Sequence, residues 1–101
     1  MNLKTMQKEV LQNKIDKGFN ITDVNMEFCL LYGEVSEAYN AWIYNKDDLG
    51  EELADVAIYL MGIAEILGLD LEKEIQYKVE KNKHRVYQHV NGILTEIPKE
   101  K

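Results

Sequence analysis

The residues that interrupt helices are placed so that most of this chain is free to be helical. Its one proline is Pro98, and three of its six glycines, Gly18, Gly68 and Gly92, follow segments whose apolar residues recur at helical spacing. Proline disrupts a helix because it lacks a backbone N–H and its ring clashes with the preceding turn. With no proline before position 98, the sequence predicts an all-α fold, a four-helix bundle.

The expected helix bounds follow from apolar periodicity, from Asp and Thr residues that can cap a helix start, and from glycines that can end one. The four expected helices are Leu3–Lys17, Thr22 or Asp23 to Tyr44, Asp47 or Asp48 to Leu67, and Leu71–His89. We expect one domain over residues 1–92 and a C-terminal tail, residues 93–101, without a clear period.

The third expected helix is apolar on almost every side. Its main stripe is Leu49, Leu53, Val56, Leu60, Ile63 and Leu67, and a second side carries Ala54, Ile58 and Met61. A helix that is apolar all round is buried all round, and a short four-helix chain can hardly surround one of its own helices. We therefore expect a second subunit, in a homodimer or a homotetramer.

The net charge, the length of the apolar runs and the cysteine content limit the partners and the cellular location that we expect. The net charge of −6 leaves no positive excess to displace counterions from phosphates, so nucleic-acid binding is not expected. The longest apolar run, Val56 to Ala64, is too short to span a bilayer, so no membrane is expected. Cys29 is the only cysteine and the N-terminus has no apolar segment of the signal-peptide type, so we expect a cytoplasmic protein.

Charge is distributed unevenly along the chain. Between Thr22 and Glu72 twelve acids accompany one base, Lys46, whereas from Lys73 onward seven bases accompany four acids. An acidic middle segment followed by a basic one suits a ligand that combines a metal ion with phosphate groups.

Four acids of the middle segment form two pairs with the same spacing. Glu34 and Glu37 are three residues apart, and so are Glu52 and Asp55. Residues at i and i+3 project from one face of a helix, so two adjacent helices would bring the four carboxylates together. Glu27, Glu34 and Glu37 also adjoin the apolar stripe of their helix, where a carboxylate is costly unless a cation or a donor meets it.

Hard divalent cations prefer carboxylate oxygens as ligands, so these acids are candidates for a metal site. One of the four paired acids, or Glu27, is a candidate general base for a metal-activated water. The alternative is that the acids form solvated helix faces, which their position beside apolar residues disfavours.

The order of the motifs resembles the MazG-type all-α nucleoside triphosphate pyrophosphohydrolases, relatives of the dimeric dUTPases and dCTP pyrophosphatases. The resemblance covers Val24 to Arg85 and rests on Glu34-x-x-Glu37, Glu52-x-x-Asp55 and Lys78-x-x-x-Asn82-x-x-Arg85. It implies a MazG-like bundle completed by a second subunit. It also implies hydrolysis of an NTP or dNTP between the α- and β-phosphates, which gives the monophosphate and pyrophosphate. The cofactor that it implies is Mg²⁺, with Mn²⁺ as an alternative.

The resemblance also implies roles for individual residues. The four paired acids, Glu34, Glu37, Glu52 and Asp55, are the expected metal ligands and catalytic residues. The expected substrate-binding residues are Lys78, Lys81, Asn82, Arg85 and Tyr59, with Tyr59 meeting the base or ribose and the others the phosphates. Gly33 stands where many members have an acid, which leaves the number of metal ions open.

Other interpretations of the same residues stay open. Lys78, Lys81 and Arg85 would also suit ion pairs with Glu74 and Glu80 on a surface helix, and Tyr59 would suit a subunit interface. Trp42 suits the core better than a stacked base. For the whole chain, the second hypothesis is a non-enzymatic regulatory or interaction dimer. A di-iron bundle is disfavoured because neither His84 nor His89 follows a glutamate by three residues.

Overall fold

The computed structural model describes residues 2–98, which form four helices followed by a β-hairpin. The elements are α1 (Leu3–Lys17), α2 (Val24–Ile43), α3 (Leu49–Ile66), α4 (Leu71–Lys83), β1 (Val86–Val90) and β2 (Ile93–Ile97). The prediction of a mainly helical chain is confirmed, and the first three helices have nearly the expected bounds. The chain divides into two compact units between Leu71 and Glu72. None of the helices within residues 2–98 is long and apolar enough to cross a membrane.

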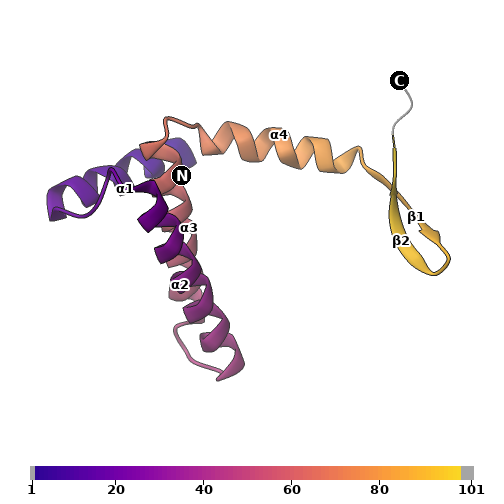
Figure 1. Cartoon of the computed structure of the whole chain (residues 1–101), viewed down its shortest axis with the longest axis horizontal. Helices are drawn as coiled ribbons and strands as arrows, with labels where there is room; N and C mark the ends of the chain where they lie inside the picture. Colours follow the sequence, from indigo (N-terminus) through magenta and orange to yellow (C-terminus); the bar gives the residue numbers. More distant parts are fainter. Residues whose placement is uncertain (1, 99–101) are drawn as a thin grey trace. The chain divides into compact units, whose positions relative to one another are not determined.

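The first unit is built on α3, which contacts both α1 and α2. The helices α2 and α3 lie side by side, and α1 crosses them near one end (Figure 1). The ends of α1 and α2 are fixed by local caps. The Asp23 carboxylate accepts a hydrogen bond from the Met26 N–H at 3.0 Å, and Gly18 ends α1 in the left-handed conformation with φ 72°.

The apolar stripe expected for α2 comprises Val24, Phe28, Leu31, Val35, Ala38 and Trp42, and the face that packs inward coincides with it only in part. Ala38 and Ala41 are buried there together with Glu27, whereas Val35 and Trp42 are 48% and 61% exposed. The prediction that Trp42 lies in the core is therefore wrong within this unit. Small residues allow α2 to approach α3 closely, and the larger apolar residues are left on a side that no helix of this unit covers.

A buried amide attaches α1 to the end of α3. The Gln7 side chain is 2% exposed and donates hydrogen bonds to Glu65 Oε2 at 2.8 Å and to the Leu69 carbonyl at 2.6 Å. It also accepts a hydrogen bond from the Leu71 N–H at 3.2 Å. All polar atoms of this buried amide group therefore have partners, as burial requires.

The second unit contains most of α4 and the hairpin, and here the predicted end of the fourth helix is wrong. The fourth helix ends at Lys83 instead of His89, and residues 93–97 of the expected tail form β2. The two strands pair in antiparallel register, with Val86 opposite Ile97. Asn91 and Gly92 turn the chain with φ of 52° and 80°, the left-handed values that a two-residue hairpin loop requires. The expected domain end at residue 92 falls in this turn, and residues 99–101 lie outside the described range.

Candidate metal centre

Three of the four predicted acids converge. Glu34 and Glu37 on α2 and Glu52 on α3 each offer one carboxylate oxygen, and these three oxygens lie within 4.8 Å of one another. The two α2 residues lie one turn apart, as their spacing predicts, and the packing of α2 on α3 brings Glu52 to them. We call Glu34, Glu37 and Glu52 the acidic cluster.

The electrostatics of the acidic cluster are unfavourable without a cation. Burial raises the pKa of Glu34, and the charges of Glu37, Asp55 and Glu52 raise it further. Burial likewise raises the pKa of Glu52, with the charge of Glu37 as the next cause. Both shifts mean that the charged form is disfavoured at these positions.

Two oxygens of the cluster also lack hydrogen bonds. Glu34 Oε2 and Glu52 Oε2 are buried and have no donor among residues 2–98. A buried carboxylate oxygen without a donor is costly. A hard divalent cation would satisfy both the charge and the vacant lone pairs, so the residues present fit Mg²⁺ or Mn²⁺.

The fourth predicted acid, Asp55, lies beside the cluster without belonging to it. It is half-buried on α3, and its charge contributes to the raised pKa values of Glu34, Glu52 and Tyr59. Asp55 is thus within electrostatic reach of the cluster, and its role as a metal ligand stays a prediction.

Glu27, the other candidate general base, already has a cation. Its side chain is 2% exposed and forms an ion pair with Lys14 of α1, whose side chain is 12% exposed. The Asn20 amide donates a further hydrogen bond to Glu27 Oε2 at 3.2 Å. The arrangement favours a structural ion pair between α1 and α2 over a base for catalysis. Sequence reasoning did not identify Lys14, although Glu27 on the apolar side of α2 required a cationic partner.

Tyr59 lies between this ion pair and the acids. The Lys14 ammonium is 5.3 Å from the centre of the Tyr59 ring. Burial raises the pKa of the Tyr59 phenol, and the charges of Glu27, Glu34 and Asp55 add to the shift. Tyr59 is therefore a neutral phenol whose ring is available for apolar and cation–π contacts.

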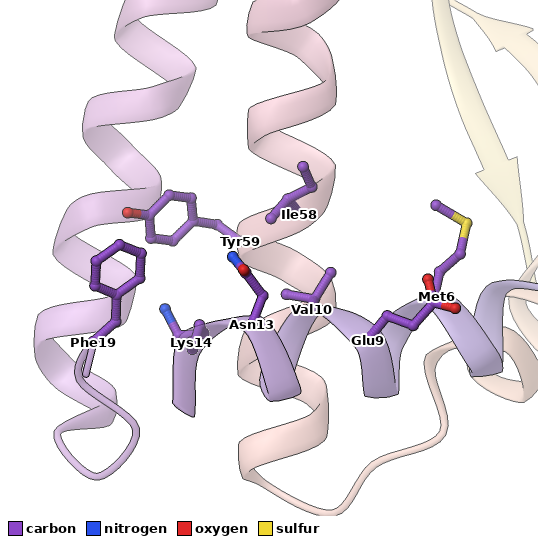
Figure 2. A pocket seen from close by; sticks show the side chains of 8 residues that line it. All are labelled: Met6, Glu9, Val10, Asn13, Lys14, Phe19, Ile58 and Tyr59. Atoms are coloured by element: carbon purple, nitrogen blue, oxygen red, sulfur yellow. The ribbon is translucent and has the colours of Figure 1, made fainter. Parts of the chain in front are cut away.

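Tyr59 also lines a mainly apolar pocket of about 320 Å³ between α1 and α3. Its lining residues are Met6, Glu9, Val10, Asn13, Lys14, Phe19, Ile58 and Tyr59. Figure 2 shows Phe19, Lys14 and Tyr59 at one end of this pocket and Met6 and Glu9 at the other. We call it the aromatic pocket. An apolar cavity that contains a small number of polar groups is typical of sites for small molecules.

A smaller pocket of about 220 Å³ opens beside the acidic cluster. It is lined by Glu37, Asn40, Ala41, Lys46, Asp48 and Glu52, and so contains two acids of the cluster. The sequence singled out Lys46 as the one base of the acidic segment without assigning it a role. We call this space the lysine pocket.

The predicted phosphate-binding residues belong to the second unit. Lys78, Lys81 and Asn82 are exposed on α4. The expectation that Arg85 shares their helix face is wrong, because α4 ends at Lys83 and Arg85 lies between α4 and β1. Its Nε is 3.3 Å from Glu96 Oε2 of β2.

The alternative role of these bases in ion pairs of α4 is not supported. Glu80 pairs with Lys83 and His84, at 3.7 Å and 3.1 Å, and within residues 2–98 neither Lys78 nor Lys81 forms an ion pair. Phosphate binding by Lys78, Lys81, Asn82 and Arg85 stays a prediction.

Comparison with known proteins adds one finding. The model of the MazG-like family matches residues 25–92, a range that contains the acidic cluster, Asp55 and Tyr59. No curated protein and no solved structure matches the chain.

Proposed function

The chain belongs to the MazG-like family, and on this basis we propose that it is a Mg²⁺-dependent pyrophosphohydrolase of nucleoside triphosphates. The proposed reaction converts an NTP or dNTP into the monophosphate and pyrophosphate. The observation that carries the proposal is the convergence of the Glu34, Glu37 and Glu52 carboxylates, two of which have buried oxygens without donors.

The acids of this chain would divide the chemistry between them. The acidic cluster would hold the metal ion, and a bound Mg²⁺ would neutralise the triphosphate and lower the pKa of a coordinated water. Asp55, half-buried one turn beyond Glu52, would either add a fourth oxygen ligand or accept the proton of the attacking water. Lys78, Lys81, Asn82 and Arg85 would stabilise the negative charge on the phosphates.

The aromatic pocket is the proposed site of the nucleoside. Tyr59 faces it and lies one turn after Asp55, so a base bound there would place the phosphates near the acids. Phe19 and Tyr59 offer ring faces for a base, and Asn13 offers an amide with both a donor and an acceptor.

The experiment that tests this function is a panel of common NTPs and dNTPs with Mg²⁺, in which release of pyrophosphate is measured. We expect turnover of at least one nucleotide and its loss when EDTA removes the metal. No pyrophosphate from any nucleotide, at high protein concentration, would favour the non-enzymatic interaction dimer instead.

A homo-oligomer is the second part of the proposal. An apolar groove of about 360 Å³ on the first unit is lined by Val35, Ala38, Tyr39, Trp42, Leu49 and Leu53. Trp42 and Leu53 are 61% and 56% exposed, and a second copy of the chain would remove this surface from water. We expect light scattering to give the mass of a dimer or tetramer and Trp42→Glu to shift it towards the monomer. A monomeric native protein would contradict this part.

A further inference from the structure

Lys46 is the one base between Thr22 and Glu72, and the fold places it at the acidic cluster. Lys46 lines the lysine pocket together with Glu37 and Glu52, both members of that cluster, and with Asp48. The pocket is therefore lined by three acids and by a lysine.

The backbone of Lys46 is held by the end of α2. Asn45 adopts the left-handed conformation, with φ 52°, and its N–H donates to the Trp42 carbonyl at 3.2 Å. The Lys46 N–H donates to the carbonyl of the buried Ala41 at 2.8 Å. This pair of bonds closes the helix in the manner of a Schellman motif. These bonds fix the backbone of Lys46 at the end of α2, the helix that carries Glu37.

The Lys46 ammonium forms no ion pair with any acid of residues 2–98, although three carboxylate residues line the same pocket. Lys14 behaves differently, because its ammonium is paired with Glu27. The donors of Lys46 are therefore available to a ligand. Asn40, one turn before Tyr44 on α2, contributes an amide to the same pocket.

The order of groups along α3 indicates which part of a nucleotide would reach Lys46. Lys46 and Asp48 precede the helix, Glu52 lies in its first turn, and Tyr59 follows about 10 Å further along the axis. A nucleotide with its base in the aromatic pocket and its phosphates at the acidic cluster would thus direct its distal phosphates towards Lys46.

We propose that Lys46, assisted by Asn40, binds the β- and γ-phosphates of the substrate, the part that leaves as pyrophosphate. The inference rests on the proposed hydrolase function. An ammonium and an amide donate to phosphate oxygens, while the neighbouring carboxylates hold the cation that accompanies them. In this proposal Lys46 is the base of the first unit that supplies a positive charge to these phosphates.

The test compares Lys46→Gln and Lys46→Arg with Lys8→Gln, a control that removes an exposed lysine of α1 outside both pockets. Calorimetry measures binding of pyrophosphate in the presence of Mg²⁺. We expect Lys46→Gln to weaken this binding by about tenfold or more, and Lys46→Arg and Lys8→Gln to stay near the native value. Nucleoside monophosphate, as a competitive inhibitor of hydrolysis, should bind equally to all variants.

A second measurement separates phosphate binding from the integrity of the site. Mg²⁺ alone should raise the melting temperature of Lys46→Gln at least as much as that of the native protein, because removal of a positive charge favours a nearby cation. Native-like binding of Mg²⁺-pyrophosphate by Lys46→Gln, or no such binding by the native protein, would overturn the role of Lys46. Pyrophosphate binding that depends on Lys46, in a protein that hydrolyses no nucleotide, would support Lys46 and reject the hydrolase.

Discussion

Two groups of acids on α2, Glu27 alone and the pair Glu34 and Glu37, meet different partners. Glu27 is 1% exposed and pairs with Lys14, a cation that the chain supplies from α1. Glu34 and Glu37, two and three turns further along, meet Glu52 instead, and buried oxygens of Glu34 and Glu52 have no donor within residues 2–98. The comparison teaches that the fold neutralises the buried Glu27 internally, whereas within residues 2–98 it supplies no ion-pair partner to Glu34, Glu37 and Glu52.

The largest expected effect comes from a substitution in the second group, Glu34 and Glu37. Replacing Glu37 by Gln removes a charged ligand while keeping the shape of the side chain, so we expect Mg²⁺-dependent hydrolysis to fall by about 10³-fold or more. Asp55→Asn is expected to abolish hydrolysis as well. The measurement is pyrophosphate release, with circular dichroism to confirm that the helices remain.

Glu51 provides the matched control for these variants. It is exposed in the first turn of α3, next to Glu52, and lies outside the acidic cluster. Glu51→Gln should keep native activity. If both Glu37→Gln and Asp55→Asn remain active, neither residue belongs to the metal site.

The next effect concerns the first group. Lys14→Met leaves Glu27 buried without its cation, so we expect the free energy of unfolding in urea to fall by about 3–5 kcal/mol. The double variant Lys14→Met with Glu27→Gln should recover most of this loss, because no buried charge then remains. A single variant as stable as the native protein would show that the ion pair does not hold α1 to α2.

The smallest effect is a dependence of stability on pH that Glu34 of the second group should produce. The folded state binds a proton on Glu34 more tightly than the unfolded state, because its pKa is raised above the usual 4.5. Without metal, Glu34 therefore contributes a loss of stability as the pH rises from 4.5 through its raised pKa.

Mg²⁺ should offset the loss of stability that Glu34 causes, because the cation binds the deprotonated acidic cluster. The increase in melting temperature that Mg²⁺ produces should therefore grow with pH. The measurement is the melting temperature of the native protein and of Glu34→Gln, with Mg²⁺ and with EDTA, between about pH 4 and pH 8, a range that begins below the usual glutamate pKa. Identical pH profiles for the two metal-free proteins would contradict the assignment.

Local signals in the sequence were sufficient for the first three helices and for the common face of Glu34 and Glu37, whereas the approach of Glu52 depends on the packing of α2 on α3. Gly18 and Asp23 mark helix ends through their own conformation and hydrogen bonds, and the i, i+3 spacing of Glu34 and Glu37 fixes their common face. The partner of Glu27 was not predicted because Lys14 lies on another helix, and helical periodicity says nothing about which helices meet. Trp42 shows the same limit: periodicity identifies an apolar face and does not say whether this chain or a second copy covers it.

The hairpin has a local signal in the sequence, which the expected fourth helix leaves out of account. Asn91-Gly92 is the dipeptide most typical of a two-residue hairpin loop, and β-branched residues flank it at Val90 and Ile93. Gly92 also suits a helix end, and that interpretation extends the expected fourth helix through Val86 to His89, whereas the structure begins β1 at Val86. The turn residues and the strand propensity of the flanking segments outweighed the helical spacing of Lys78, Asn82 and Arg85.

The most direct test of the account is anomalous diffraction from crystals of the native protein soaked in Mn²⁺. We expect a manganese peak between the carboxylates of Glu34, Glu37 and Glu52, and none at Glu27, whose charge Lys14 already balances. An empty acidic cluster at saturating Mn²⁺, or a metal ion bound only elsewhere, would contradict the claim that this group of acids depends on a cation from solution.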